Sequence, residues 1–173
     1  MEWFESGGHT IHQADTYEAD DCLATLAWQI VSGESQESKV VIYSHDGDIN
    51  QLLVPGRITR IPRATMSWGH IDPQYLTHDG LVKKHGVRSG QWIDYRTLTG
   101  DASDGYKGCP GIGPKRARTL LEHGTLDEVL SDPELVQKFK IDQQWIGTAR
   151  RWRRILTLRT NVPITFRGHI RIL

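Results

Sequence analysis

The chain has 173 residues, 38% of them hydrophobic, and a formal net charge of zero. That length is enough for one ordinary hydrophobic core with a small satellite cluster. The only two cysteines, Cys22 and Cys109, lie far apart in the sequence, which argues against a disulfide framework and against a zinc site. The acidic start is unlike a signal peptide, and no apolar run reaches the roughly 20 residues of a membrane span. We therefore expect a cytoplasmic protein without a membrane partner.

The zero net charge hides two halves of opposite sign. Residues 1–104 carry 8 Lys and Arg against 15 Asp and Glu, whereas residues 105–173 carry 13 against 6. Such a division indicates different partners for the two halves, although chance segregation of surface charge gives the same pattern.

The first half of the chain has an α/β pattern. Apolar residues at helical spacing predict a helix over 18–33, which ends at Gly33. The β-branched run 39–44 predicts a buried strand, 49–53 a short helix, and 57–62 a further strand. Helix, loop and buried strand in this order indicate a mostly parallel sheet.

From Thr77 onward the pattern is helical. In the last helix, four apolar residues share one face and are expected in the core: Trp145, Ala149, Trp152 and Leu156. The helical segments are 78–86, 89–100, 113–124, 126–139 and 142–159.

Acidic side chains gather in three places. One cluster opens the first helix, one follows the buried strand, and one lies just before the glycine-rich turn; taken alone, each also fits a turn or a helix cap. Carboxylates brought together are tolerated when protonated or bound to cations, and hard divalent ions prefer oxygen ligands. Two such ions can stabilise both oxygens of a phosphodiester displacement. The candidate ligands are Glu18, Asp20, Asp21, Asp46, Asp48, Asp101 and Asp104.

A basic, glycine-rich turn follows the last acidic cluster. Its glycines let the backbone approach a partner, and Pro114 suits the first turn of a helix whose free N–H groups can bind a phosphate. Such a turn contacts the nucleic-acid backbone without reading base sequence. The candidate DNA-binding residues are Gly111, Gly113, Lys115, Arg116 and Arg118.

The stretch 91–130 closely resembles the 5′-nuclease (flap endonuclease) family, as found in bacterial DNA polymerase I and in phage 5′ nucleases. Segments 16–27, 40–53 and 156–164 match the same family in the same order, so the resemblance covers nearly the whole chain. It implies metal-dependent hydrolysis of phosphodiesters near 5′ ends, flaps or nicks. It also implies that the seven carboxylates above are the family's metal ligands, with two Mg²⁺ or Mn²⁺ ions and no other catalytic residue.

The resemblance further implies a fold. We expect a PIN-like α/β core over 1–75, with a partial, mostly parallel sheet that binds metal, and a helical part over 76–173 with a helix–three-turn–helix DNA clamp. In relatives, carbonyls of that loop often hold a potassium ion. The resemblance starts about a hundred residues into the family domain, so strands, an arch and some metal ligands lack a counterpart. Relatives often have a lysine at the position of Gly47.

These features leave three functions open. The first is a metal-dependent 5′ nuclease that acts on duplex DNA with a 5′ end or flap. The second is a DNA-binding module that needs a homo-oligomer or a partner chain to complete its site. The third is a ribonuclease of related fold, since nothing in the sequence separates DNA from RNA. Retention of all seven carboxylates favours the nuclease, because an acidic cluster repels DNA and has no use in a pure binder.

Overall fold

The computed structural model describes residues 10–33, 35–67, 70–102 and 104–167. The chain divides into two compact units. The first unit combines residues 1–38 with 158–173, and the second unit contains residues 39–157. These units differ from the two parts expected from the sequence, a metal-binding part over 1–75 and a DNA-binding part over 76–173. That functional division stays a prediction. No helix among the described residues is long and apolar enough to cross a membrane.

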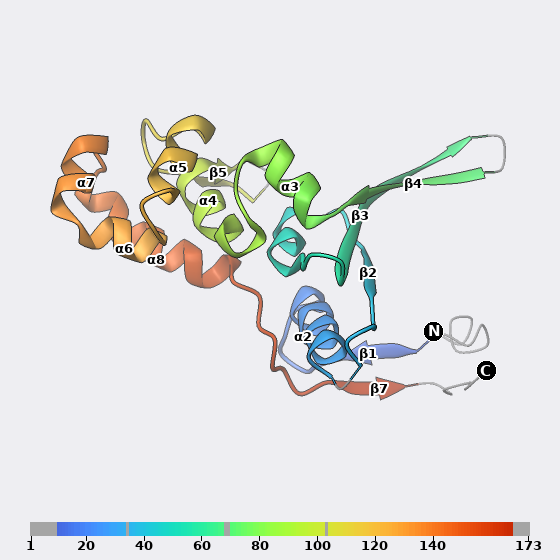
Figure 1. The fold of residues 1–173 in the computed structure, drawn as a ribbon. Helices are drawn as coiled ribbons and strands as arrows, with labels where there is room; N and C mark the ends of the chain where they lie inside the picture. The colour runs from blue at the N-terminus through green and yellow to red at the C-terminus, as the bar shows by residue number, and fades with distance from the viewer. Residues whose placement is uncertain (1–9, 34, 68–69, 103, 168–173) are drawn as a thin grey trace. The chain divides into compact units, whose positions relative to one another are not determined.

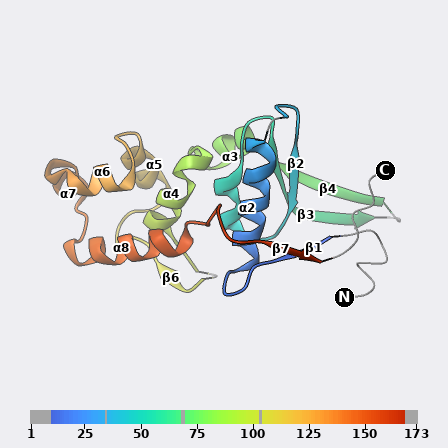
Figure 2. The same cartoon turned by 90° about the horizontal axis from the view of Figure 1, so that it is seen from below.

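The first unit joins the two ends of the chain. Strand β1 (Ile11–Gln13) pairs antiparallel with β7 (Thr165–Arg167), beside helix α2 (Ala19–Ser32) (Figures 1 and 2). Buried Thr25 holds the returning segment, since its hydroxyl donates to the carbonyl of Arg159 at 3.3 Å and accepts from the amide of Val162 at 3.2 Å. Helix α2 confirms the helix that the sequence predicts over 18–33.

A three-stranded sheet opens the second unit. Its strands are β2 (Val40–Tyr43), β3 (Ile58–Ser67) and β4 (His70–Leu76), in the order β2-β3-β4. β2 and β3 are parallel, whereas β3 and β4 are antiparallel and form the long ribbon of Figure 1. The α/β class is confirmed, but the sheet is mixed rather than mostly parallel, because β4 follows β3 closely in the chain and returns beside it.

Helices make up most of the rest of the second unit. Side chains cap several of them: Thr125 and Glu128 form a capping box at α6, and Asp132 accepts two backbone N–H bonds at the start of α7. The α-helices are α3 (His78–His85), α4 (Trp92–Thr99), α5 (Pro114–Leu121), α6 (Leu126–Ser131), α7 (Pro133–Phe139) and α8 (Gln143–Leu156). Two 3₁₀ helices, η1 (Gly47–Leu52) and η2 (Ser89–Gln91), belong to the same unit.

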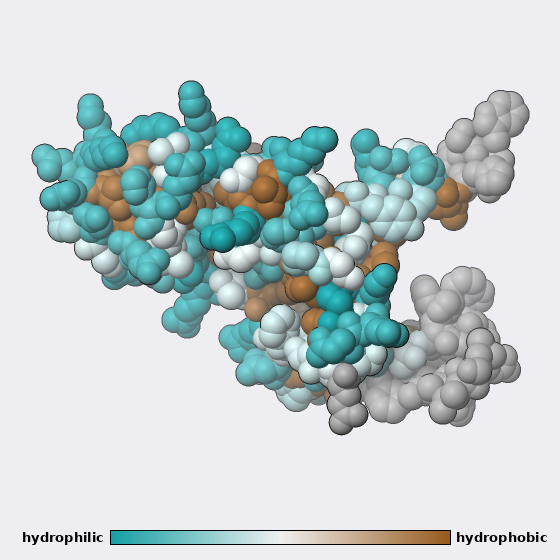
Figure 3. Space-filling model, viewed as in Figure 1, coloured by the Kyte–Doolittle hydropathy of each residue, from teal (hydrophilic) through white to brown (hydrophobic). Residues whose placement is uncertain are grey.

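One hydrophobic core joins these helices. Leu81, Leu98, Leu120 and Val129 are fully buried in it, and hydrophilic side chains cover most of the surface of these helices in Figure 3. The predicted face of α8 is confirmed as core. Its partly buried Trp152 packs against that core and stacks on Tyr106 with ring centroids 4.5 Å apart, and Trp145, Ala149 and Leu156 are buried.

Candidate functional site

The end of β2 places Asp46 and Asp48. Asp46 caps η1, because its Oδ1 accepts a hydrogen bond from the Asp48 amide at 2.8 Å. The Asp46 amide in turn donates to the Ser44 hydroxyl at 3.1 Å. This turn leaves Asp46 exposed and directs Asp48 inward, with 14% of its side chain accessible to solvent.

A small hairpin places Asp101 and Asp104. Strands β5 (Gly100–Asp101) and β6 (Tyr106–Lys107) pair antiparallel, with Asp101 opposite Tyr106. The hairpin requires glycine at position 100, where φ is +77° and a Cβ atom would collide with the backbone nitrogen of Gly108. Asp101 lies partly buried at the base of the hairpin, and Asp104 lies exposed near its tip.

Arg96 brings three of these carboxylates together. Its Nε lies 3.4 Å from Oδ1 of Asp48, and its Nη2 lies 3.3 Å from Oδ2 of Asp104 and contacts Oδ2 of Asp101. The backbone around Arg96 is fixed, since the Tyr106 hydroxyl donates to the Arg96 carbonyl at 2.8 Å. We refer to Asp48, Asp101 and Asp104 around this guanidinium as the acidic centre.

Helix α4 is also tied to η1. The indole N–H of Trp92 donates to the carbonyl of Gly47 at 2.8 Å. Sequence reasoning missed Arg96 altogether. Its only signal in the sequence is a basic residue in the helix that leads directly into Asp101.

Burial and crowding perturb Asp48. Its burial is the main cause that raises the pKa to about 6; Arg96 opposes this rise, and Asp46, Asp104 and Asp101 add to it. Oδ1 of Asp48 and Nε of Arg96 are both buried without a hydrogen-bond partner among the described residues. One guanidinium therefore faces three carboxylates, and Oδ1 of Asp48 keeps unused hydrogen-bonding capacity.

The donor set of the acidic centre fits a hard divalent cation, which prefers oxygen ligands and suits a buried carboxylate oxygen without a partner. The arrangement as it stands is built around arginine. Among the residues that the structure describes, no group of three Asp, Glu, His or Cys side chains is positioned to hold a metal ion. The residues fit a metal chemically, and Arg96 lies between them.

The remaining predicted ligands lie in the first unit. Glu18 is the N-cap residue of α2 without a side-chain cap, and Asp20 and Asp21 lie in the first turn. Asp21 serves a structural contact, because its Oδ1 accepts from the Arg159 amide at 2.8 Å. The association of this cluster with the acidic centre stays a prediction.

The basic turn is ordered by its own side chains. Gly111 has φ +73°, and Gly113 and Pro114 open α5. Arg116 is committed to the backbone: it donates to the carbonyl of Gly111 at 2.6 Å and to that of Phe139 at 2.5 Å. This contact uses one of the loop carbonyls of the expected potassium site.

Two other basic residues of α5 face outward. Lys115 and Arg118 are exposed, and the stem of Arg118 covers Gly86, where a Cβ atom would collide with it. They are therefore better placed for a phosphate than Arg116.

A basic cavity of about 590 Å³ adjoins the acidic centre. Arg96 and Gly47 belong to its lining, which contains no carboxylate. The other lining residues are Asn50, Arg60, Pro62, Arg63, Gln74, Tyr75, Leu76, Lys84, His85 and Trp92.

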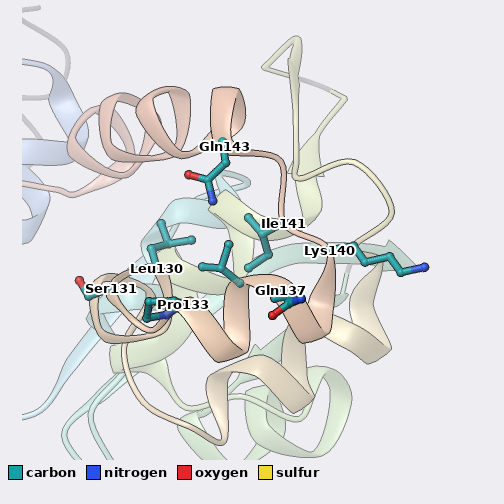
Figure 4. Close-up of a pocket in the computed structure, with 8 residues that line it drawn as sticks. Leu130, Ser131, Pro133, Gln137, Lys140, Ile141 and Gln143 are labelled. Atoms are coloured by element: carbon teal, nitrogen blue, oxygen red, sulfur yellow. The ribbon is translucent and has the colours of Figure 1, made fainter.

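A second cavity of about 550 Å³ lies where α6, α7 and the start of α8 meet. Leu130 and Ile141 point toward one another there, whereas Lys140 extends away (Figure 4). No acidic residue lines this cavity, and none of its lining residues belongs to the acidic centre.

Comparisons with known proteins show what this chain is similar to. Residues 87–169 match the family described as 5′-3′ exonuclease, C-terminal SAM fold. Flap endonuclease Xni of Shewanella pealeana is 32% identical over 166 residues, which are 91% of this chain and 59% of the relative. The thermostable DNA polymerase I of Thermus aquaticus is 42% identical over 117 residues, 67% of this chain and 13% of that enzyme. The chain thus spans little more than half of the flap endonuclease and a small part of the polymerase.

Solved structures show the same fold. Bacteriophage T5 5′-exonuclease with bound zinc has a TM-score of 0.59 and 23% identity, over 83% of this chain and 51% of that one. The T5 flap endonuclease in a pseudo-enzyme–product complex with DNA and metal ions has a TM-score of 0.60 and 20% identity, over 80% of this chain and 49% of that one. These matches confirm the resemblance that the motifs carry: the chain has the α/β fold of the 5′-3′ exonuclease and flap endonuclease family, with its C-terminal SAM fold over residues 87–169.

Proposed function

We propose that this chain is a metal-dependent 5′ nuclease that hydrolyses DNA phosphodiesters near 5′ ends or flaps. The observation that carries the proposal is the acidic centre, where three carboxylates from two separate segments meet at one guanidinium. One guanidinium offsets only part of the charge of three carboxylates, so the centre can still favour a further cation.

The surroundings of the acidic centre suit a nucleic acid. The lining of the adjoining cavity includes the exposed Arg63 and Lys84, which can neutralise backbone phosphates, whereas Arg60 is buried and donates to Ser44 and Asn50. Lys115 in the first turn of α5 and Arg118 further along it are exposed and supply a second contact of the same kind.

The cofactor belongs to the same proposal. The relatives from bacteriophage T5 were crystallised with metal ions, one of them with DNA as well. Asp46, Asp48, Asp101 and Asp104 would hold Mg²⁺ or Mn²⁺, and Glu18, Asp20 and Asp21 stay the predicted further ligands of the two ions that the resemblance implies. Such ions polarise the phosphodiester and lower the pKa of an attacking water. A potassium ion at the loop of Gly111 is the remaining expectation.

Two other functions remain as outcomes of the test. A DNA-binding module fits the basic turn equally well, and it is favoured by the salt bridges that already occupy the acidic centre. A ribonuclease would use the same carboxylates, because the phosphodiester is common to both nucleic acids.

The test is cleavage of a 5′-labelled flap DNA by the purified chain with Mg²⁺ or Mn²⁺. The double variant Asp48→Asn/Asp101→Asn should lose this cleavage, and EDTA should abolish it in the wild type. Asp79→Asn is the matched control, because this carboxylate is 95% exposed on α3, outside the acidic centre.

Cleavage that persists in the double variant would refute the assignment of the site. Metal-independent binding without cleavage would identify the chain as a binding module. Cleavage of the matching RNA alone would identify a ribonuclease.

A partner for the sheet is part of the expectation from the sequence. β2 lies at an edge of its sheet, and its Val41 and Tyr43 are 57% and 60% exposed. No strand in the described part of the chain pairs with this edge, and such an edge with apolar side chains nearby favours pairing with further strands. We infer that a second copy or a partner chain covers this edge, and a monomeric mass by light scattering with no gain of mass on mixing with lysate proteins would contradict it.

A further inference from the structure

We propose that Arg96 is a built-in counter-ion of the acidic centre and competes with a divalent cation for Asp48, Asp101 and Asp104. The inference rests on the proposed function only in taking such a cation as the ligand. It concerns a residue that the sequence motifs do not single out, and it makes Arg96 a positioning residue for the carboxylates.

The contacts of Arg96 support this role. One guanidinium reaches three carboxylates on two different segments, so it holds η1 and the β5–β6 hairpin together from α4. Without that positive charge, mutual repulsion would drive the carboxylates apart. A divalent cation between the same oxygens would also offset this repulsion. The cation and the guanidinium cannot occupy the same position, so they compete.

Gly47 supplies a second, independent observation. A Cβ atom at this position would lie 3.6 Å from Nη1 of Arg96, and the three heavy atoms nearest to it all belong to the guanidinium. A Cβ atom would fit there in van der Waals contact, whereas a longer side chain pointing the same way would meet the guanidinium. In this chain the cation beside Asp46 and Asp48 comes from α4 rather than from the turn itself.

The guanidinium also fits this place poorly. Its Nε and Oδ1 of Asp48 are buried, lie 3.4 Å apart, and neither has a hydrogen-bond partner among the described residues. On its other side Arg96 lines the basic cavity of about 590 Å³. The contacts of Nη2 with Asp101 and Asp104 therefore hold the guanidinium, while its Nε stays unsatisfied and its other side borders a cavity.

Competition predicts a direction for metal affinity. A cation within about 4–6 Å changes the pKa of a carboxylate by roughly 1–3 units, which corresponds to a tenfold or larger change in the affinity of a competing cation. Removing the charge of Arg96 should therefore tighten metal binding. A residue that instead helps the metal to bind would show the opposite change.

The experiment is titration of the metal-free chain with Mn²⁺, followed by calorimetry and by the electron paramagnetic resonance of free Mn²⁺. Arg96→Met and Arg96→Gln should each lower the Kd at least about tenfold. Arg96→Lys, which keeps the charge, should stay within about threefold of the wild type. Arg151→Met on the exposed surface of α8 controls for the lost charge of the whole protein.

Thermal unfolding gives a second readout. Arg96→Met should unfold at a lower temperature than the wild type in EDTA and should gain more from Mg²⁺. Arg96→Gln keeps hydrogen-bond donors and serves where the methionine variant does not fold.

An unchanged or weaker affinity in the neutral variants would overturn the proposal, and so would the absence of Mn²⁺ binding in all variants. If the chain cleaves DNA but all variants bind Mn²⁺ equally well, the proposed nuclease function stands and the counter-ion role of Arg96 is refuted. The expected order of affinities without any cleavage would keep the counter-ion and reject the nuclease.

Discussion

Asp94 is the carboxylate whose loss should cost this fold the most. It lies on α4, is 4% exposed, and faces two partners. Oδ2 accepts from the amide of Leu126 at 2.9 Å, and Oδ1 accepts from Nε of Arg153 at 2.5 Å. The side chain thus joins α4 to the start of α6 and to α8, and α4 is the helix that carries Arg96.

The two contacts set the size of the effect of Asp94→Ala. An unsatisfied buried N–H at Leu126 costs about 1–3 kcal/mol. Loss of the charged hydrogen bond adds about 1 kcal/mol rather than the full 1.5–3 of a buried pair, because Arg153 is 36% exposed and keeps its contact with Asp127. We expect a loss of about 3 kcal/mol in the free energy of unfolding and a fall in Tm of roughly 10 °C.

Urea unfolding followed by circular dichroism measures this loss. Asp94→Asn should show about half of it, because the amide oxygen still accepts from Leu126. A double-mutant cycle of Asp94→Asn with Arg153→Met should give a coupling energy of about 1 kcal/mol. A loss under about 1 kcal/mol in Asp94→Ala would refute the assignment of this bond as the tie between the three helices.

Four shorter predictions follow from other contacts. Gly108→Ala should lower the free energy of unfolding by about 2 kcal/mol or more, because a Cβ atom would collide with the carbonyl oxygen of Leu98. Gly90→Ala is the control, because a Cβ atom there has no neighbour within 4 Å, and equal Tm values for the two variants would contradict the prediction. Burial raises the pKa of Cys109 to about 11, so its thiol should resist iodoacetamide at pH 8 until the chain is unfolded, and rapid alkylation seen by mass spectrometry would contradict this. Lys115→Ala should reduce the salt dependence of DNA binding by about one unit in fluorescence anisotropy, and an unchanged slope would remove Lys115 from the interface. Hydrogen bonds from the Thr125 backbone and side chain lower the pKa of Glu128, so its stabilisation is present above the ordinary value of 4.5 and is lost as the pH falls through the lowered one; Tm measured against pH should show this loss in the wild type and not in Glu128→Gln.

Much of the fold could be predicted from the sequence. The helix that ends at Gly33, the strand before Asp46 and the core face of α8 all follow from patterns among neighbouring residues. Local hydrogen bonds, helical periodicity and caps depend on residues a few positions apart, so the chain encodes them directly. The three places where carboxylates gather, and the basic turn, are visible for the same reason.

The second strand of the β3–β4 ribbon was not predicted. Its Asp72 and Pro73 are residues that strands avoid, and pairing with β3 overrides that local preference. The pairing of β1 with β7 is even less visible, because the hydrogen bonds join segments at opposite ends of the chain.

The acidic centre shows most clearly what only the tertiary structure decided. The sequence alone determined which carboxylates are available, with Asp48 after a strand and Asp101 and Asp104 just before a glycine-rich turn. Packing of α4 against η1 and against the β5–β6 hairpin decided that Asp48, Asp101 and Asp104 face one guanidinium, and that Asp21 instead binds the backbone of Arg159. Charge alone attracts a carboxylate to any cation, whereas the partner it finds depends on which helices the core holds together.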